Sequence, residues 1–209
     1  MSRWFAPDSP LMRAMRIFAD IIHLNLMIII TSLPLITVGA SLSAAYATAR
    51  GELNDLGGGL TVRYLREFRR NLARCSMLWL LLAVAGVALL ALWRAVPVLP
   101  VHMLLSLCAA LWTTVFLWTW PLQARFDNGV AGTLRTALLV GMAHLPRTVL
   151  MLGEVVVYVA LLIMACRLLP QALFLLLVTG VGLLVFLHIG PTEHAFAPLV
   201  ARTAPVSTQ

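Results

Sequence analysis

Long apolar runs separated by short basic segments dominate this chain. The runs that carry at most one charge are Ile21–Ala49, Cys75–Trp93, Ala95–Ala124, Thr148–Cys166 and Leu168–Thr192. A helix needs about 20 apolar residues to cross the roughly 30 Å hydrocarbon core of a bilayer. Each run meets or approaches that length. The pattern therefore predicts an all-α fold, a polytopic membrane helix bundle with five to six transmembrane or re-entrant segments.

Prolines mark several helix starts. Leu99-Pro100, Leu145-Pro146 and Leu169-Pro170 stand where a helix should begin, and a proline in the first turn loses no helical hydrogen bond. We predict a single membrane domain. Its parts are a polar N-terminal segment (1–16), a first helix and hairpin (17–49), a cytoplasmic amphipathic segment (50–74), transmembrane helices at 75–93, 101–122, 148–166 and 170–190, a cytoplasmic connector helix (125–147) and a tail (201–209).

The first apolar run leaves two topologies open. A single crossing over 17–38 places ten arginines on one side of the membrane and five on the other. A turn at Ser32-Leu33-Pro34 with a return through Ile36–Ala49 gives thirteen and two. The positive-inside rule favours the hairpin. Its return leg of ~14 residues is only about 21 Å long, which is short of a full crossing.

Composition excludes a water-soluble domain. The 209 residues are 61% hydrophobic and 11% charged, with a mean hydropathy of +0.95, whereas soluble domains carry about 25% charged residues. The net charge of +7 comes entirely from arginines that lie beside apolar runs. Anionic lipid and the positive-inside bias explain these arginines better than nucleic acid does. We expect a multi-pass protein of a bacterial plasma membrane.

The segment from Leu60 to Arg74 has a basic amphipathic pattern. On a helical wheel its apolar and basic side chains occupy opposite arcs of about 140° each. This predicts a helix in the membrane interface, which either anchors the chain on anionic lipid or docks a cytoplasmic partner. Candidate docking residues here and in the second cytoplasmic segment are Arg63, Arg66, Arg69, Arg70, Arg125 and Asp127.

The second cytoplasmic segment, 125–147, is predicted to be a turn followed by a helix that Asp127 or Asn128 caps. Two roles are open for it. It is either a plain connector on the membrane surface or a coupling helix that meets another protein.

Ionisable groups inside apolar runs are costly and indicate function or specific pairing. Asp20, His23 and Asn25 lie near one another in the first helix and are candidates for a polar site. A local pair between Arg16 and Asp20 explains Asp20 without any function. His188 is expected near the end of the last helix, in a capping or snorkelling role.

Glu154 is the stronger intramembrane candidate. It lies roughly 12 Å along its helix from Pro146, and no basic residue is within one turn. It must pair across helices or stay protonated. We therefore expect either an interhelical structural partner or a substrate or proton site.

No catalytic chemistry is recognisable. The acids and histidines have no local metal-ligand spacing, and no nucleophile motif or nucleotide-binding loop is present. We expect a protein that is not an enzyme and that holds no metal or cofactor.

A series of short motifs resembles the YesL family of bacterial membrane proteins. The motifs are Asp8-Ser9-Pro10, Ser32-Leu33-Pro34, Thr37-Val38-Gly39-Ala40-Ser41, Pro121-Leu122 with Arg125-Phe126-Asp127-Asn128, and Leu145-Pro146-Arg147. The family has no established activity, and its members often accompany carbohydrate importers. The resemblance implies an accessory protein of a carbohydrate ABC importer, with permease and ATPase subunits or a second copy as partners. A small transporter with an intramembrane acidic site is the alternative.

Both topologies place the segments 50–74 and 125–147 in the cytoplasm, because together they hold nine of the fifteen arginines. Single cysteines at Gly58 and Gly129, in a background without other cysteines, should therefore resist an impermeant thiol reagent in intact cells. Labelling of both positions would overturn this orientation.

Overall fold

A computed structural model describes residues 10–53 and 59–203. The predicted polar segment before Pro10, the turn at Gly57–Gly58 and the end of the tail lie outside these residues. The described elements are α1 (Pro10–Ser32), the short 3-10 helix η1 (Leu35–Thr37), α2 (Val38–Leu53), α3 (Leu60–Ala95), α4 (Leu99–Arg125), α5 (Val130–Ala143), α6 (Leu145–Leu168) and α7 (Pro170–Thr203). The predicted all-α class is confirmed, and the described residues include no strand.

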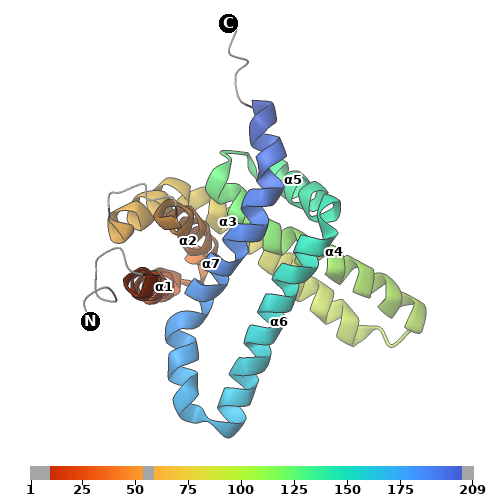
Figure 1. Cartoon of the computed structure of the whole chain (residues 1–209). Coiled ribbons are helices and arrows are strands. Elements are labelled where there is room, and N and C mark those ends of the chain that lie inside the picture. Colours follow the sequence, from red (N-terminus) through yellow and green to blue (C-terminus); the bar gives the residue numbers. More distant parts are fainter. Residues whose placement is uncertain (1–9, 54–58, 204–209) are drawn as a thin grey trace, which may run out of the picture.

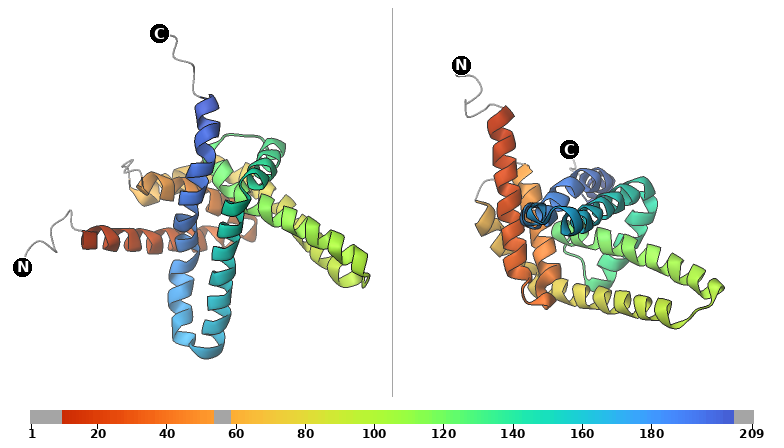
Figure 2. Two further views of the ribbon diagram at one scale, coloured as in Figure 1. Left: turned by 45° about the vertical axis from the view of Figure 1, so that its right-hand side comes forward. Right: turned by 90° about the horizontal axis from the view of Figure 1, so that it is seen from below.

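Five of these helices are long and apolar enough to cross a membrane: Ala14–Ser32 within α1, α3, α4, α6 and Pro170–Phe196 within α7. Figure 1 shows that α3 with α4, and α6 with α7, form two long hairpins that leave a common body and diverge. The other views show α1 running across α7 rather than alongside it (Figure 2). The chain is therefore a polytopic membrane protein with projecting hairpins.

The centre of the body is α2, which contacts α1, α3, α4 and α7. Its buried positions carry glycine, alanine, serine and threonine side chains, with Tyr46 as the one aromatic residue among them. Such small side chains let helix backbones approach closely. In lipid, where burying apolar surface gains little free energy, helices associate through this close packing. At Gly39 an added Cβ would collide with the backbone oxygen of Cys75, the ring of Trp120 and the Cβ of Trp79.

The first apolar run turns back on itself. α1 ends at Ser32, and after η1 the chain continues as α2, which contacts α1. The number of membrane crossings that this run makes stays a prediction. Hydroxyl groups hold the turn, because Thr31 Oγ1 lies 2.9 Å from Ser41 Oγ and 2.6 Å from the hydroxyl of Tyr64 on α3. The membrane orientation of both chain ends stays a prediction.

The amphipathic segment is not a separate helix. It forms the first part of α3, which continues without a break for 36 residues into the membrane span. Arginine is a good helix former, so a basic stretch lowers hydropathy without ending the helix. Leu60 and Tyr64 are buried in the core that α2 shares. Much of the apolar face of this segment therefore contacts protein rather than lipid.

The helix starts at prolines are confirmed, since α4 and α6 carry proline in their first turn and α7 begins at Pro170. The predicted cap of the connector is wrong. α5 begins after Gly129, which is its N-cap, and no side chain caps it. Asp127 instead forms an ion pair with Arg74 of α3, so its carboxylate joins the segment before α5 to α3.

The crossing of α1 and α7 depends on Gly182. A Cβ built there lies 2.5 Å from the backbone oxygen of Ile21, whereas a Cβ at Gly190 of the same helix meets nothing within 4 Å. Gly182→Ala should therefore lower the free energy of unfolding by about 1–3 kcal/mol through overpacking. Gly190→Ala, the matched control, should be neutral or raise it by up to about 1 kcal/mol through helix propensity. Thermal unfolding in mild detergent measures both, and equal melting temperatures would contradict the tight crossing.

Candidate functional site

Glu154 has a partner on another helix. Its Oε2 atom on α6 lies 3.1 Å from Nε2 of His188 on α7, and the Glu154 side chain is 22% exposed. Neither atom makes an aligned hydrogen bond. Glu154 needs a polar partner because its surroundings are apolar. That partner is the imidazole of His188, which lies 34 residues further along the chain.

His188 does not cap or snorkel as expected. α7 continues past it to Thr203, so His188 lies in the interior of the helix and its side chain is only 4% exposed. Its Nδ1 atom lies 2.7 Å from the hydroxyl of Tyr46 on α2, and the two rings are nearly parallel. The imidazole thus stands between a phenol and a carboxyl group.

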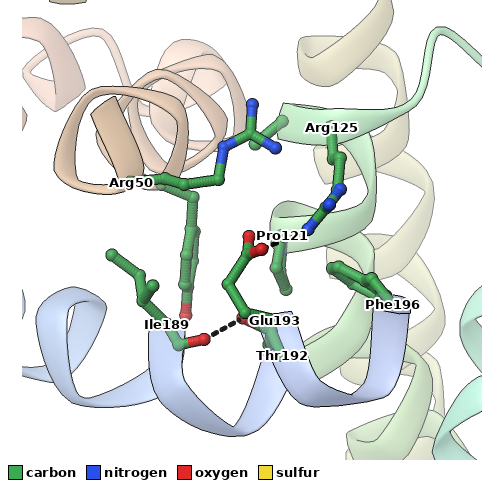
Figure 3. A pocket seen from close by; sticks show the side chains of 9 residues that line it. Arg50, Pro121, Arg125, Ile189, Thr192, Glu193 and Phe196 are labelled. Atoms are coloured by element: carbon green, nitrogen blue, oxygen red, sulfur yellow. Dashed lines mark hydrogen bonds and ion pairs between the residues drawn. The ribbon is translucent and has the colours of Figure 1, made fainter. Parts of the chain in front are cut away.

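Tyr46 also lines a small cavity at the same end of the body as the start of α5. The other polar residues around it are Arg50, Arg125, Thr192 and Glu193. Figure 3 shows the Glu193 carboxylate pointing from α7 toward Arg125 of α4, with Arg50 of α2 extending over the same space. The cavity measures about 10 Å³, which is roughly the room of one water molecule.

Charges in this cavity are closely matched. Arg125 Nη1 lies 2.5 Å from Glu193 Oε2, and the guanidinium stands 5.7 Å from the centre of the Phe196 ring. Burial, and next the positive charge of Arg125, lower the pKa of Arg50, while Glu193 raises it. Glu193 therefore offsets two neighbouring cations.

The predicted site of Asp20, His23 and Asn25 does not converge. Asn25 is fully buried and turns toward α7, where its Nδ2 donates to the Leu177 carbonyl at 2.7 Å and its Oδ1 accepts from the Gly182 amide at 3.0 Å. His23 is exposed, with Nε2 lying 2.9 Å from the Thr61 hydroxyl. Asn25 thus acts as a clamp between α1 and α7.

Asp20 is half-buried and lies near enough to Arg16 and His23 to interact with their charges. Asp20 takes no part in the hydrogen bonds that Asn25 makes to α7. Within residues 10–53 and 59–203, no three acidic, histidine or cysteine side chains gather closely enough to hold a metal ion.

The arginines of the two segments predicted to be cytoplasmic fall into two groups. Some form ion pairs within the chain: Arg63 with Glu52 at 3.2 Å, Arg70 with Glu67 at 3.1 Å, and Arg125 with Glu193. Arg66 and Arg69 are exposed, and with Val62 and Leu65 they line a groove of about 400 Å³. Arg66 and Arg69 are therefore the members of the predicted docking set that line this groove.

The cavity, the polar chain and the diverging hairpins define a polytopic helical membrane protein with a buried ionisable cluster. Residues 21–93, from within α1 to near the end of α3, match the model of a family described as protein of unknown function, DUF624. Proteins similar to YesL belong to that family of uncharacterised proteins. Comparison with curated proteins and with solved structures gives no match.

Sequence reasoning found Glu154, assigned His188 the wrong role and missed Tyr46. The one signal that could have found them is the isolated aromatic residue within the small-residue stretch Ser43–Ala49 together with a histidine inside an uncharged run. Their approach is tertiary, across 142 positions, and no local periodicity encodes it.

If Glu154 acts only as a structural partner of His188, Glu154→Gln should leave the free energy of unfolding nearly unchanged, because the amide keeps shape and hydrogen bonding. Glu154→Ala should lower it by about 1–3 kcal/mol, since His188 Nε2 then stays buried without a partner. Denaturant unfolding of the purified variants measures both. A stable Gln variant that abolishes sugar uptake supported by the protein would contradict a purely structural role.

Proposed function

We propose that this chain is a non-enzymatic membrane accessory or scaffold protein that binds the transmembrane helices of a partner. The observation that carries the proposal is the divergence of the two hairpins, α3 with α4 and α6 with α7 (Figure 2). Only 11% of the most apolar window of α6 is buried within the chain. Long faces of both hairpins are thus free to meet other helices.

Small residues on these faces favour helices as neighbours rather than lipid alone. Ser106 and Ala110 are four residues apart on α4 and exposed, and Gly153 on α6 has nothing within 4 Å of an added Cβ. Exposed small residues at this spacing allow another helix to approach closely. The same pattern on α2 supports the packing within the chain.

The cytoplasmic side offers a second contact region. Arg66 and Arg69 flank an apolar-edged groove and are exposed. An acidic segment of a partner at the membrane surface would complement their charge.

The partner we propose is a carbohydrate ABC importer in a bacterial plasma membrane. The support for this partner is the YesL resemblance, since members of that family often accompany carbohydrate importers, together with the match of residues 21–93 to the uncharacterised family. Contact would run through the hairpins to the permease and through the arginine groove to the ATPase side.

A small transporter is the second candidate. The paired Glu154 and His188 favour it, because ionisable groups inside a membrane span commonly mark ion or substrate paths.

Site-specific photo-cross-linking in cells that express the importer tests the scaffold proposal. A cross-linker at Met103, one turn before Ser106, or at Val157, one turn after Gly153, should capture the permease subunit, because these positions flank the exposed small residues. Phe174 is the control, since its exposure of 74% exceeds the 66% and 59% of the two test positions and no exposed small residue neighbours it.

Capture of the permease from Met103 or Val157 but not from Phe174 supports the proposal. Capture of a second copy of the chain would replace the importer with self-association. Equal capture of unrelated membrane proteins from all three positions would contradict a specific docking face.

A further inference from the structure

Three polar groups from three helices lie next to one another inside the body. The Tyr46 hydroxyl lies 2.7 Å from His188 Nδ1, and His188 Nε2 lies 3.1 Å from Glu154 Oε2. His188 Nε2 and Glu154 Oε2 are both buried atoms that lack an aligned hydrogen-bond partner among the described residues. Two such atoms at this separation are placed to share one proton.

Charge balance indicates where that proton lies. If His188 is neutral and Glu154 carries no proton, Glu154 is an anion inside an apolar region, which is costly. One added proton gives either a neutral acid beside neutral imidazole or a carboxylate beside imidazolium. A low dielectric disfavours charged forms, so the neutral acid beside neutral imidazole is the stable arrangement.

We propose that Tyr46, His188 and Glu154 form a proton relay that loads Glu154 from the cavity lined by Arg50, Arg125 and Glu193. The inference does not depend on whether the chain docks on an importer, because it concerns only contacts within the chain.

The relay step balances in protons. In the unloaded state the Tyr46 hydroxyl donates to His188 Nδ1, and Nε2–H faces the Glu154 carboxylate. A hydronium ion that reaches the cavity from bulk solvent gives a proton to the Tyr46 oxygen and becomes water. The original phenol proton passes to Nδ1, and the Nε2 proton passes to the carboxylate. Afterwards Nδ1–H donates to Tyr46, the Glu154 acid donates to Nε2, and the cluster has gained one proton and lost one negative charge.

The cavity end of the relay is polar. Arg50 on α2, Arg125 on α4 and Glu193 on α7 surround the space next to Tyr46, which has room for about one water molecule. The cavity therefore has room for one water molecule beside the charged groups that proton exchange needs.

The other end of the relay faces an apolar groove. Glu154 lines a groove of about 450 Å³ between α6 and α7 whose other lining groups are apolar or already bonded. The Tyr158 hydroxyl donates to the Leu176 carbonyl, and Thr179 donates to that of Leu175. Glu154 is thus a terminal proton site rather than a step in a complete channel.

Infrared spectroscopy of the full chain in lipid nanodiscs tests the relay. At neutral pH the protein should show a protonated-carboxyl band that Glu154→Gln removes. After transfer to D₂O, Tyr46→Phe should slow the deuterium shift of that band by about tenfold or more, because the phenol link is gone. Tyr158→Phe is the matched control, since it removes a hydroxyl from the same groove but not from the relay, and its exchange rate should equal that of the unmodified protein.

Two results would overturn the proposal. One is the absence of any carboxyl band that Glu154→Gln removes, which would mean that Glu154 is ionised. The other is an exchange rate in Tyr46→Phe equal to that of Tyr158→Phe, which would mean that protons reach Glu154 by a different route. Melting temperatures recorded on the same samples show whether each variant is folded, and His188→Gln, which also interrupts the relay, should slow exchange as Tyr46→Phe does.

Discussion

Close packing around α2 is the constraint on which the rest of the structure depends. Four long helices, α1, α3, α4 and α7, contact this 16-residue helix. In a membrane, burying apolar surface between helices gains little free energy. Short side chains instead allow the backbones to come close, so that van der Waals contacts stabilise the packing. Larger residues at positions such as Gly39 would push α3 and α4 away, and the origins of both hairpins would shift with them.

Tyr46 links that packing to the polar cluster. It is the one large side chain between Ser43 and Ala49, and it extends from the centre of the body to His188 on α7, which in turn reaches Glu154 on α6. The hairpin of α6 and α7 is therefore held to the body by polar contacts as well as by the crossing at Gly182. The contacts of Tyr46, His188 and Glu154 therefore affect both the position of this hairpin and the chemistry of the cluster.

The fold class and most helix boundaries could be predicted from sequence, because hydropathy and proline positions are local signals. α4, α6 and α7 begin where Leu99-Pro100, Leu145-Pro146 and Leu169-Pro170 indicate. The arginine counts and Pro34 favoured the turn after Ser32 over a single crossing but left both open. The continuity of α3 could not be predicted, since arginines between 63 and 74 reduce hydropathy while leaving the helix intact.

The site was predictable only in part. An isolated glutamate in an apolar run indicates that it has a polar partner. The identity of that partner depends on which faces of α2, α6 and α7 meet. His188 lies in an uncharged run whose helical end is not visible in the sequence, so its position inside α7 was missed. Similarly, Asp20, His23 and Asn25 are neighbours along α1, yet helical geometry turns Asn25 toward α7 and His23 toward Thr61 of α3.

The nitrogen chemical shifts of the His188 imidazole, measured by ¹⁵N NMR on the full chain in lipid, test most directly that Tyr46, His188 and Glu154 act as one unit. The structure predicts a neutral imidazole at pH 7, with one nitrogen shift that responds to Tyr46→Phe and the other to Glu154→Gln. Shifts typical of a solvent-exposed histidine that titrates freely and ignores both substitutions would contradict the account.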